Sequence, residues 1–161
     1  MPTIEEIIND VILREGPATN DPADHGGRTA FGISEKANPE AWSDGKVTSD
    51  EARAIFEQKY IKYPKIDQIV DLGLQAQMAD YSVNSGPYIA IQALQRAVGA
   101  EIDGVLGPET LGLVNGAPDA RLVGNRVVAE RVLMFGRIVK KDITQVRFLL
   151  GWLDRTLSFL R

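Results

Sequence analysis

Residues 13–34 read LREGPATNDPADHGGRTAFGIS, and this stretch separates a helical beginning from the rest of the chain. Before it, Thr3 and Glu6 have the spacing of a capping box, and apolar residues recur at helical intervals, which predicts a helix over residues 3–15. Gly16 and Pro17 end that helix. The turn formers that follow predict a small ribbon, with RTAFGI (residues 28–33) as its last strand.

The remainder of the chain is predicted to be helical. Thr48 and Glu51 form a second capping-box pattern, and Pro64 ends the helix that it opens. Further helical patterns cover residues 67–84, 87–98, a short segment from Pro108, 118–140 and 142–160. The predicted fold class is therefore mainly α, with one small β-ribbon after the first helix.

The final segment, residues 142–160, carries apolar residues at spacings of three and four. Such a stripe predicts a buried helix, and a helix lying on a membrane surface is the alternative. The stripe consists of Ile143, Val146, Leu150, Leu153, Leu157 and Leu160, and it is widened by Phe148, Leu149, Trp152 and Phe159.

Length and composition limit the classes of protein. At 161 residues the chain fits one domain, which we divide into an N-terminal lobe of about 1–66 and a C-terminal lobe of about 67–161. It has no cysteine and a single histidine, His25, so a disulfide framework, a thiolate zinc site and a multi-histidine site are excluded. We interpret His25 as a loop residue. We expect no metal, no cofactor and no transmembrane segment, and the start MPTIEEIIND lacks a signal-peptide pattern.

Charge is distributed unevenly along the chain. Residues 1–117 hold nine basic and eighteen acidic groups, whereas residues 118–161 hold nine basic and four acidic groups. A basic C-terminal part can face an anionic surface such as wall polymer or lipid. The alternative is that the two parts attract each other.

Glu15 lies where a carboxylate has an electrostatic cost. In the last helical turn it faces the negative end of the helix dipole, which opposes the charged form by about 0.3–1 kcal/mol. A carboxyl that keeps its proton can act as a general acid, and glycoside cleavage needs such an acid to protonate the departing oxygen. The alternative is a solvated glutamate at a helix end.

Two aspartates follow Glu15 in the turn segment. If the ribbon folds back over the helix end, Asp21 or Asp24 would face Glu15, and paired carboxylates can activate water or stabilise an oxocarbenium ion. Asp21 precedes a proline and is a good turn former, whereas turn formation explains the presence of Asp24 less well. Thr29 lies at the start of the returning strand, where its hydroxyl could hold a water molecule.

These residues resemble a known family. EGPATNDPADHGGRTAFGIS, residues 15–34, resembles the signature E-G-G-Y-x-N-D-P-x-D-x-G-G-x-T-x-x-G-I-T of the N-acetylmuramidases of glycoside hydrolase family 108, which include phage endolysins and secretion-associated muramidases. ADYSVNSGPYIAIQALQRAVGAEIDGVLGPETL, residues 79–111, resembles the predicted peptidoglycan domain that follows in those proteins. Together the two segments touch most of residues 3–115.

The resemblance implies a lysozyme-like fold that hydrolyses the bond between N-acetylmuramic acid and N-acetylglucosamine, with no cofactor. It implies Glu15 as the catalytic acid, accompanied by Asp24 and Thr29, with Asp21 as the competing second carboxylate or a substrate contact. By resemblance we also expect inversion at the anomeric carbon. The chain departs from the signature at Pro17 and Ala18, where the family has Gly-Tyr, and so lacks a ring and an amide donor beside Glu15.

A second group of residues could line the opposite wall of a sugar-binding cleft. Aromatic faces suit sugar rings, and amide and hydroxyl groups suit their substituents. This group consists of Tyr81, Asn84, Ser85 and Gly86, and its alternative interpretation is a capped helix end. The turn DGVLGPET (residues 103–110) resembles turns of peptidoglycan-binding modules, and we favour its completing a single domain.

The leading hypothesis is a monomeric muramidase of the phage endolysin type that lyses the bacterial wall. Its partner would be peptidoglycan glycan strands, with no nucleic acid, and with weak contact to anionic surfaces through the basic C-terminal helices. Without an export signal it would be made in the host cytoplasm and reach the periplasm through a holin or a secretion route. Two alternatives stay open: a module that binds peptidoglycan without cleaving it, and a component of a phage tail or secretion machine.

Overall fold

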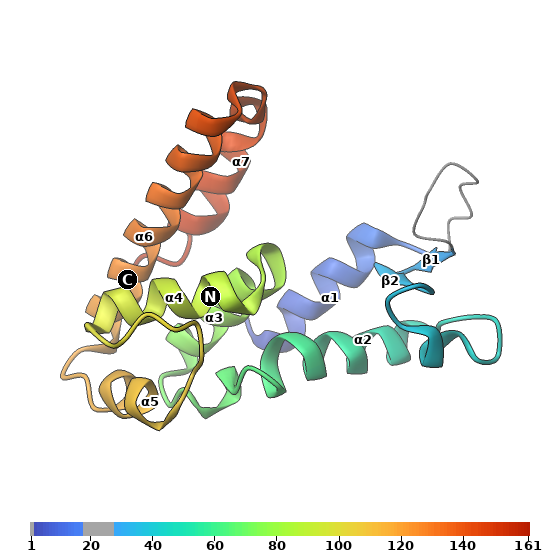
Figure 1. Ribbon diagram of the computed structural model, residues 1–161, viewed down its shortest axis with the longest axis horizontal. Coiled ribbons are helices and arrows are strands. Elements are labelled where there is room, and N and C mark those ends of the chain that lie inside the picture. Colours follow the sequence, from blue (N-terminus) through green and yellow to red (C-terminus); the bar gives the residue numbers. More distant parts are fainter. Residues whose placement is uncertain (1, 18–27) are drawn as a thin grey trace.

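The computed structural model describes residues 2–17 and 28–161, and within them the chain is mainly helical, as predicted. Figure 1 shows a body of helices with a two-stranded ribbon at one end and a helical hairpin projecting from the other part. The helices are α1 (Ile4–Glu15), α2 (Ser49–Glu57), α3 (Leu72–Ser85), α4 (Pro87–Val98), α5 (Pro108–Asn115), α6 (Ala120–Lys141) and α7 (Val146–Leu157). Short 3-10 turns lie at η1 (Pro39–Trp42), η3 (Ile66–Gln68) and η4 (Ile143–Gln145), and a π-helical turn, η2 (Gln58–Lys62), continues α2.

Both predicted capping boxes are confirmed. At the start of α1, the Thr3 N–H donates to Glu6 Oε2 (2.7 Å), and Thr3 Oγ1 accepts from the Glu6 N–H (3.2 Å). Thr48 and Glu51 make the same pair of bonds at the start of α2. Each box satisfies backbone donors that a helix start otherwise leaves without partners. The two helices lie side by side, so that the apolar face of α1 is buried.

The ribbon differs from the single strand predicted for residues 28–33. It is a hairpin in which β1 (Thr29–Ala30) pairs antiparallel with β2 (Ile33–Ser34), joined by Phe31 and Gly32. Both joining residues have positive φ, 51° and 78°, which is the backbone of a tight two-residue hairpin turn. The prediction that RTAFGI forms a single strand was wrong, because a two-residue turn divides this segment into β1 and the start of β2.

The centre of the molecule is built from α3, α4 and α6. Their small and branched residues allow close helix packing, and Leu74, Met78, Ala90, Leu94 and Val127 are completely buried. The core extends without a break from these helices to the apolar face of α1 and to the ribbon. The ribbon and the end of α1 are therefore supported by the same core.

The C-terminal hairpin also departs from expectation. Figure 1 shows α6 and α7 side by side, with their shared turn far from the body. The stripe predicted to be buried is largely open to solvent: Ile143 is 70% exposed and Leu150 75%, and Val146, Leu157 and Leu160 are exposed as well. The prediction was wrong for these residues because α7 packs on α6 through residues that widen the stripe, among them Trp152, whose ring centroid lies 5.2 Å from that of Phe135.

A buried ion-pair cluster fixes the base of this hairpin. Asp80 of α3 is buried and accepts from Arg131 of α6 at 2.7 Å and from Arg155 of α7 at 2.6 Å. One carboxylate thus connects three helices. Arg161 reaches back to Asp71 at 2.7 Å, so part of the C-terminal positive charge is paired within the molecule. Among the described residues, no helix combines the length and the apolar character needed to cross a membrane.

Candidate active site

Glu15 is the last residue of α1, as the sequence predicts, and its side chain is exposed. The helix stops there because Gly16 adopts φ 66° and ψ 179°, a conformation that favours glycine. The Gly16 N–H still donates to the Ile12 carbonyl at 3.1 Å. The Glu15 carboxylate therefore stands at the end of a well-formed helix, beside the ribbon.

The turn of the ribbon lies directly against Glu15. The Phe31 N–H donates to the Gly16 carbonyl at 2.8 Å, which ties the turn to the helix end. A β-carbon built on Gly32 would lie 3.1 Å from Glu15 Cγ and 3.3 Å from Phe56 Cζ. Only a glycine fits this approach without displacing a neighbour, so Gly32 lets the turn lie directly against the Glu15 side chain. The turn signals considered from the sequence did not include Phe31-Gly32, which the tight hairpin now explains.

Three side chains brace the ribbon from its other side. Arg28 forms a bidentate ion pair with Glu35 (2.9 and 2.7 Å), and its guanidinium lies 4.9 Å from the centre of the Trp42 ring. Trp42 is buried and donates through Nε1 to the Ile33 carbonyl at 3.3 Å. The hydrogen bond from Arg28 lowers the pKa of Glu35, which keeps this pair ionised at neutral pH.

Thr29 lies on β1, where it pairs with Ser34 and is half-buried. This places it on the strand whose end is bonded to the end of α1. Asp21, Asp24 and His25 lie outside the described residues.

Aromatic residues lead from Glu15 towards α3. Phe56 is buried and stacks on Tyr60 with the ring centroids 5.5 Å apart. The Tyr60 carbonyl accepts a bond from Ser82 Oγ at 2.9 Å. Tyr60, which is only half-buried, thus links the neighbourhood of Glu15 to the C-terminal part of α3.

The second predicted group is not a uniform cleft wall. Tyr81 is 1% exposed, its hydroxyl points to Met134 Sδ (3.4 Å), and burial raises its pKa. The expectation that its ring would face a sugar does not fit this position, because the α3–α6 interface covers the ring. Asn84 is exposed and donates to the Asp80 carbonyl at 2.7 Å. Ser85 ends α3, and Gly86 (φ 86°) forms the turn into α4.

Comparison with known proteins identifies both parts of the chain. Residues 8–86 match the model of the glycosyl hydrolase 108 family. These residues belong to the glycosyl hydrolase 108 family. Residues 89–157 match the predicted peptidoglycan domain, so the two matches meet at the α3–α4 turn, whereas the sequence-based division into lobes lies at 66/67.

A solved structure supports the same assignment. The chain is similar to the structure of Brucella abortus SagA, with a TM-score of 0.71 and 28% identity. The similarity covers 97% of this chain and 90% of SagA. A comparison with curated proteins gave no match. The family assignment indicates a glycoside hydrolase that acts on peptidoglycan.

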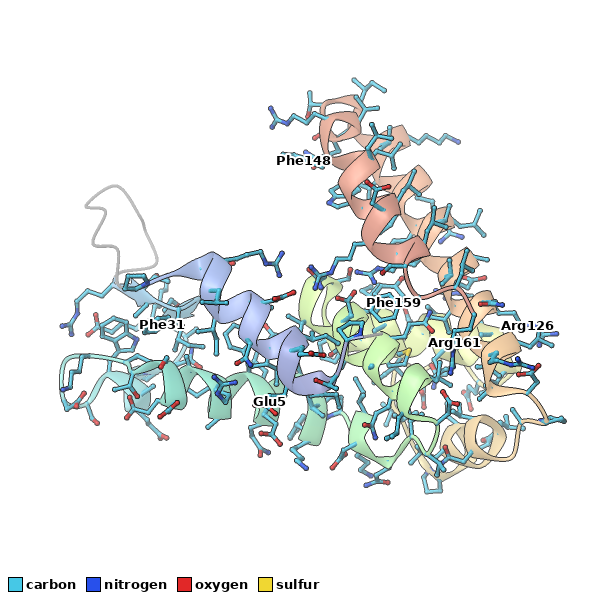
Figure 2. All side chains as sticks on the ribbon, turned by 180° about the vertical axis from the view of Figure 1, so that it is seen from behind. Glu5, Phe31, Arg126, Phe148, Phe159 and Arg161 are labelled. Carbon is cyan, nitrogen blue, oxygen red and sulfur yellow. The ribbon has the colours of Figure 1, made fainter. Side chains whose placement is uncertain are left out.

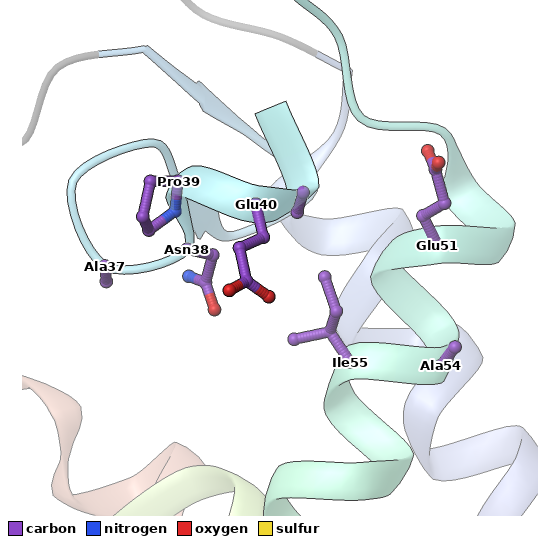
Figure 3. Close-up of a pocket in the computed structure, with 8 residues that line it drawn as sticks. Ala37, Asn38, Pro39, Glu40, Glu51, Ala54 and Ile55 are labelled. Atoms are coloured by element: carbon purple, nitrogen blue, oxygen red, sulfur yellow. The ribbon is translucent and has the colours of Figure 1, made fainter. Parts of the chain in front are cut away.

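The glycosyl hydrolase 108 domain also contains a groove of about 570 Å³ between η1 and α2, shown in Figure 3. Glu40 and Glu51 line it, and Glu15 does not. Glu51 is part of the capping box, and the bond from the Thr48 N–H lowers the pKa of Glu51. A carboxylate held ionised in this way is a poor proton donor, so Glu51 is not suited to act as a general acid.

The predicted peptidoglycan domain is organised around Gln95. Its Nε2 donates to Asp103 Oδ1 (2.6 Å) and to the Val105 carbonyl (3.0 Å), and its Oε1 accepts from the Gly104 N–H (2.8 Å). Gly104 has φ 74°, and a β-carbon there would meet the Tyr88 ring at 2.3 Å. The DGVLGPET turn is thus held in place by specific contacts with α4. Among the described residues, no cluster of three or more potential metal-binding side chains occurs.

Proposed function

We propose that this protein is an N-acetylmuramidase that hydrolyses the β-1,4 bond between N-acetylmuramic acid and N-acetylglucosamine, with Glu15 as the general acid. The observation that carries the proposal is the position of Glu15: exposed at the end of α1, inside the glycosyl hydrolase 108 domain, with Gly32 of the ribbon turn against its side chain. A positioned carboxyl next to an open surface meets the first requirement of glycoside cleavage.

In this proposal Glu15 donates its proton to the glycosidic oxygen as the bond to the anomeric carbon breaks. Asp24, or Asp21 in its place, accepts a proton from the water that attacks the opposite face of that carbon. The Thr29 hydroxyl holds this water. The reaction inverts the anomeric configuration, and it requires a gap between the two carboxyl groups wide enough for a water molecule, roughly 6.5–9.5 Å.

Substrate contacts are proposed on both domains. The half-buried ring of Tyr60 offers an apolar face to a sugar near Glu15, and Asn84, Ser85 and Gly86 supply polar groups at the end of α3. The predicted peptidoglycan domain would hold the same glycan strand beyond the cut bond. We further propose an endolysin role, with the protein released from the cytoplasm to the wall by a holin.

The test is digestion of purified sacculi followed by identification of the new reducing ends. Wild-type protein is expected to release fragments with reducing N-acetylmuramic acid. Glu15→Gln is expected to release none, because the amide cannot donate a proton. Reducing N-acetylglucosamine would contradict the bond assignment, and release of wall fragments by both proteins at the same rate would contradict the role of Glu15.

Matched variants separate chemistry from binding. Glu40→Gln removes an exposed carboxylate from the groove beside η1 and is expected to leave the rate unchanged. Asp21→Asn and Asp24→Asn, compared in the same assay, identify the second carboxylate as the one whose loss stops hydrolysis. A wild-type protein that sediments with sacculi but releases no fragments would instead support a binding module.

A further inference from the structure

The outer end of the α6–α7 hairpin, residues 137–150, exposes apolar side chains that the fold does not use. We call this segment the hairpin tip. Leu150 is 75% exposed, Ile143 70%, Val146 50% and Phe148 45%. Val146 and Leu150 are four residues apart on α7 and so share one side of it, and Ile143 lies in the 3-10 turn η4 that comes directly before α7. Figure 2 shows Phe148 near the far end of the hairpin, with Phe159 and Arg161 at its base.

This apolar side is distinct from the side that packs on α6. The contact between the two helices uses Phe135 and Trp152, while Thr156 and Phe159 are buried near the base. Asp80 adds its ion pairs to Arg131 and Arg155 at the same base. The hairpin is therefore held by other residues, and the exposed stripe is left open.

The same tip is strongly cationic. Arg137, Lys140, Lys141 and Arg147 are exposed, and none of them belongs to an ion pair found within residues 2–17 and 28–161. The one acidic residue, Asp142, accepts bonds from Thr144 and Gln145, which lower its pKa. Four cations and one anion leave the tip with a net charge of +3.

We propose that the hairpin tip binds the surface of an anionic lipid bilayer. Ile143, Val146 and Leu150 would enter the interface between headgroups and acyl chains, and the lysines and arginines would contact lipid phosphates. An interfacial helix has this composition, with large apolar residues on one side and Lys or Arg beside them. Because the tip projects from the body, it can reach a surface while the acidic part of the chain within residues 2–17 and 28–117 stays away from it.

The charge and the apolar side chains of the tip argue against three other occupants. A second copy of the chain, related by a two-fold axis, would bring two +3 tips together, and like charges oppose such an interface. Nucleic acid or wall polymer would satisfy the cations but would leave the apolar side chains in water. An anionic bilayer satisfies both features of the tip.

The first experiment measures pelleting of the full chain with phosphatidylcholine vesicles, with and without phosphatidylglycerol. Binding is expected only with the anionic lipid and is expected to weaken as salt is raised. The variant Lys140→Gln/Lys141→Gln/Arg147→Gln should lose roughly fivefold in partitioning for each charge at low salt. The control Lys36→Gln/Lys46→Gln removes exposed lysines near the ribbon and should bind like the wild type.

The apolar contribution has its own matched pair. Leu150→Asp is expected to reduce partitioning more than tenfold, whereas Leu13→Asp, at an equally exposed position on α1, leaves it unchanged. Since the chain has no cysteine, Leu150→Cys and Leu13→Cys can each carry one polarity-sensitive fluorophore. The emission of the label at position 150 should shift to the blue with anionic vesicles, and that of the label at position 13 should not.

Several results would overturn the proposal. These are equal binding to neutral vesicles, unchanged binding of both the triple variant and Leu150→Asp, or a lipid-free dimer that Leu150→Asp dissociates. The proposal is independent of Glu15: Glu15→Gln should bind vesicles like the wild type, and Leu150→Asp should digest lipid-free sacculi at the wild-type rate. A failure of the muramidase proposal is thereby distinguished from a failure of this one.

Discussion

Gly32 lies so close to Glu15 that a β-carbon at position 32 would come within 3.1 Å of Glu15 Cγ. The contact joins the turn of the ribbon to the end of α1, two elements that the chain separates by the whole loop segment. It makes Gly32 a positioning residue for the proposed acid.

Gly32→Ala is expected to reduce both stability and activity. The alanine must adopt φ near 78° and press on Glu15 and Phe56, which should cost about 1–3 kcal/mol of unfolding free energy. Urea unfolding measures this cost, and the rate of sacculus digestion should fall further than the folded fraction does. The matched control is Gly136→Ala on α6, where a β-carbon meets nothing within 4 Å and should be neutral or stabilising.

Glu15→Gln should separate activity from stability. Hydrolysis is expected to fall by about 10²–10⁴-fold, the usual contribution of a general acid. Stability should stay the same or rise by a few tenths of a kcal/mol, because a negative charge is lost from the negative end of α1. Thermal unfolding at low salt measures the second effect. A clear loss of stability would assign Glu15 a structural role instead.

Asp80→Ala should be strongly destabilising. It leaves Arg131, which is buried, without its carboxylate and removes the partner of Arg155, and breaking such a pair typically costs about 3–5 kcal/mol. Chemical unfolding of the variant should also lose cooperativity if the hairpin comes away from the body first. Arg121→Gln removes the exposed partner of Asp119, leaves the Asp119 cap of α6 in place, and should change stability little. Equal effects of the two variants would contradict the anchoring role.

The ion pair between Asp71 and Arg161 predicts a pH dependence. The bond from Arg161 lowers the pKa of Asp71 in the folded protein, so its stabilising effect is complete above the unfolded pKa and is lost as pH falls through the lower folded value. Arg161→Gln should therefore be less stable than the wild type at pH 7, by about 1 kcal/mol or less, and the difference should vanish well below pH 4. Arg14→Gln, which removes an exposed arginine of α1, should show no such convergence.

Gln95→Ala should weaken the second domain. It removes the acceptor of the buried Gly104 N–H, and a buried group left unpaired costs about 1–3 kcal/mol, whereas the Val105 carbonyl keeps its bond from the Gly107 N–H. Hydrogen exchange should show faster exchange at Gly104, while Gln92→Ala, one turn earlier on α4, leaves it protected. Unchanged exchange in Gln95→Ala would contradict the role of this side chain as the centre of the turn.

Local signals in the sequence predicted most helices correctly because each depends on neighbouring residues. Thr3 with Glu6, Thr48 with Glu51, and the prolines at 87 and 108 all act within one turn of the chain. The same kind of signal failed at RTAFGI, where Phe31 has a positive φ and its N–H bonds to the Gly16 carbonyl of a distant segment. The prediction from local signals was also wrong at α7, because the spacing of apolar residues does not show whether a partner helix covers them.

The features of the candidate site likewise fall into those that the sequence predicts and those that only the structure shows. The sequence by itself determined that an acidic residue ends the first helix, that turns follow it, and that the chain resembles glycoside hydrolase family 108. These follow from hydrogen bonds and helix periodicity over a few residues. Only the tertiary structure decided that Gly32 lies against Glu15, that Tyr81 is covered by α6, and that the α7 stripe faces solvent. Contacts between distant segments depend on how the helices pack, and no local pattern specifies that packing.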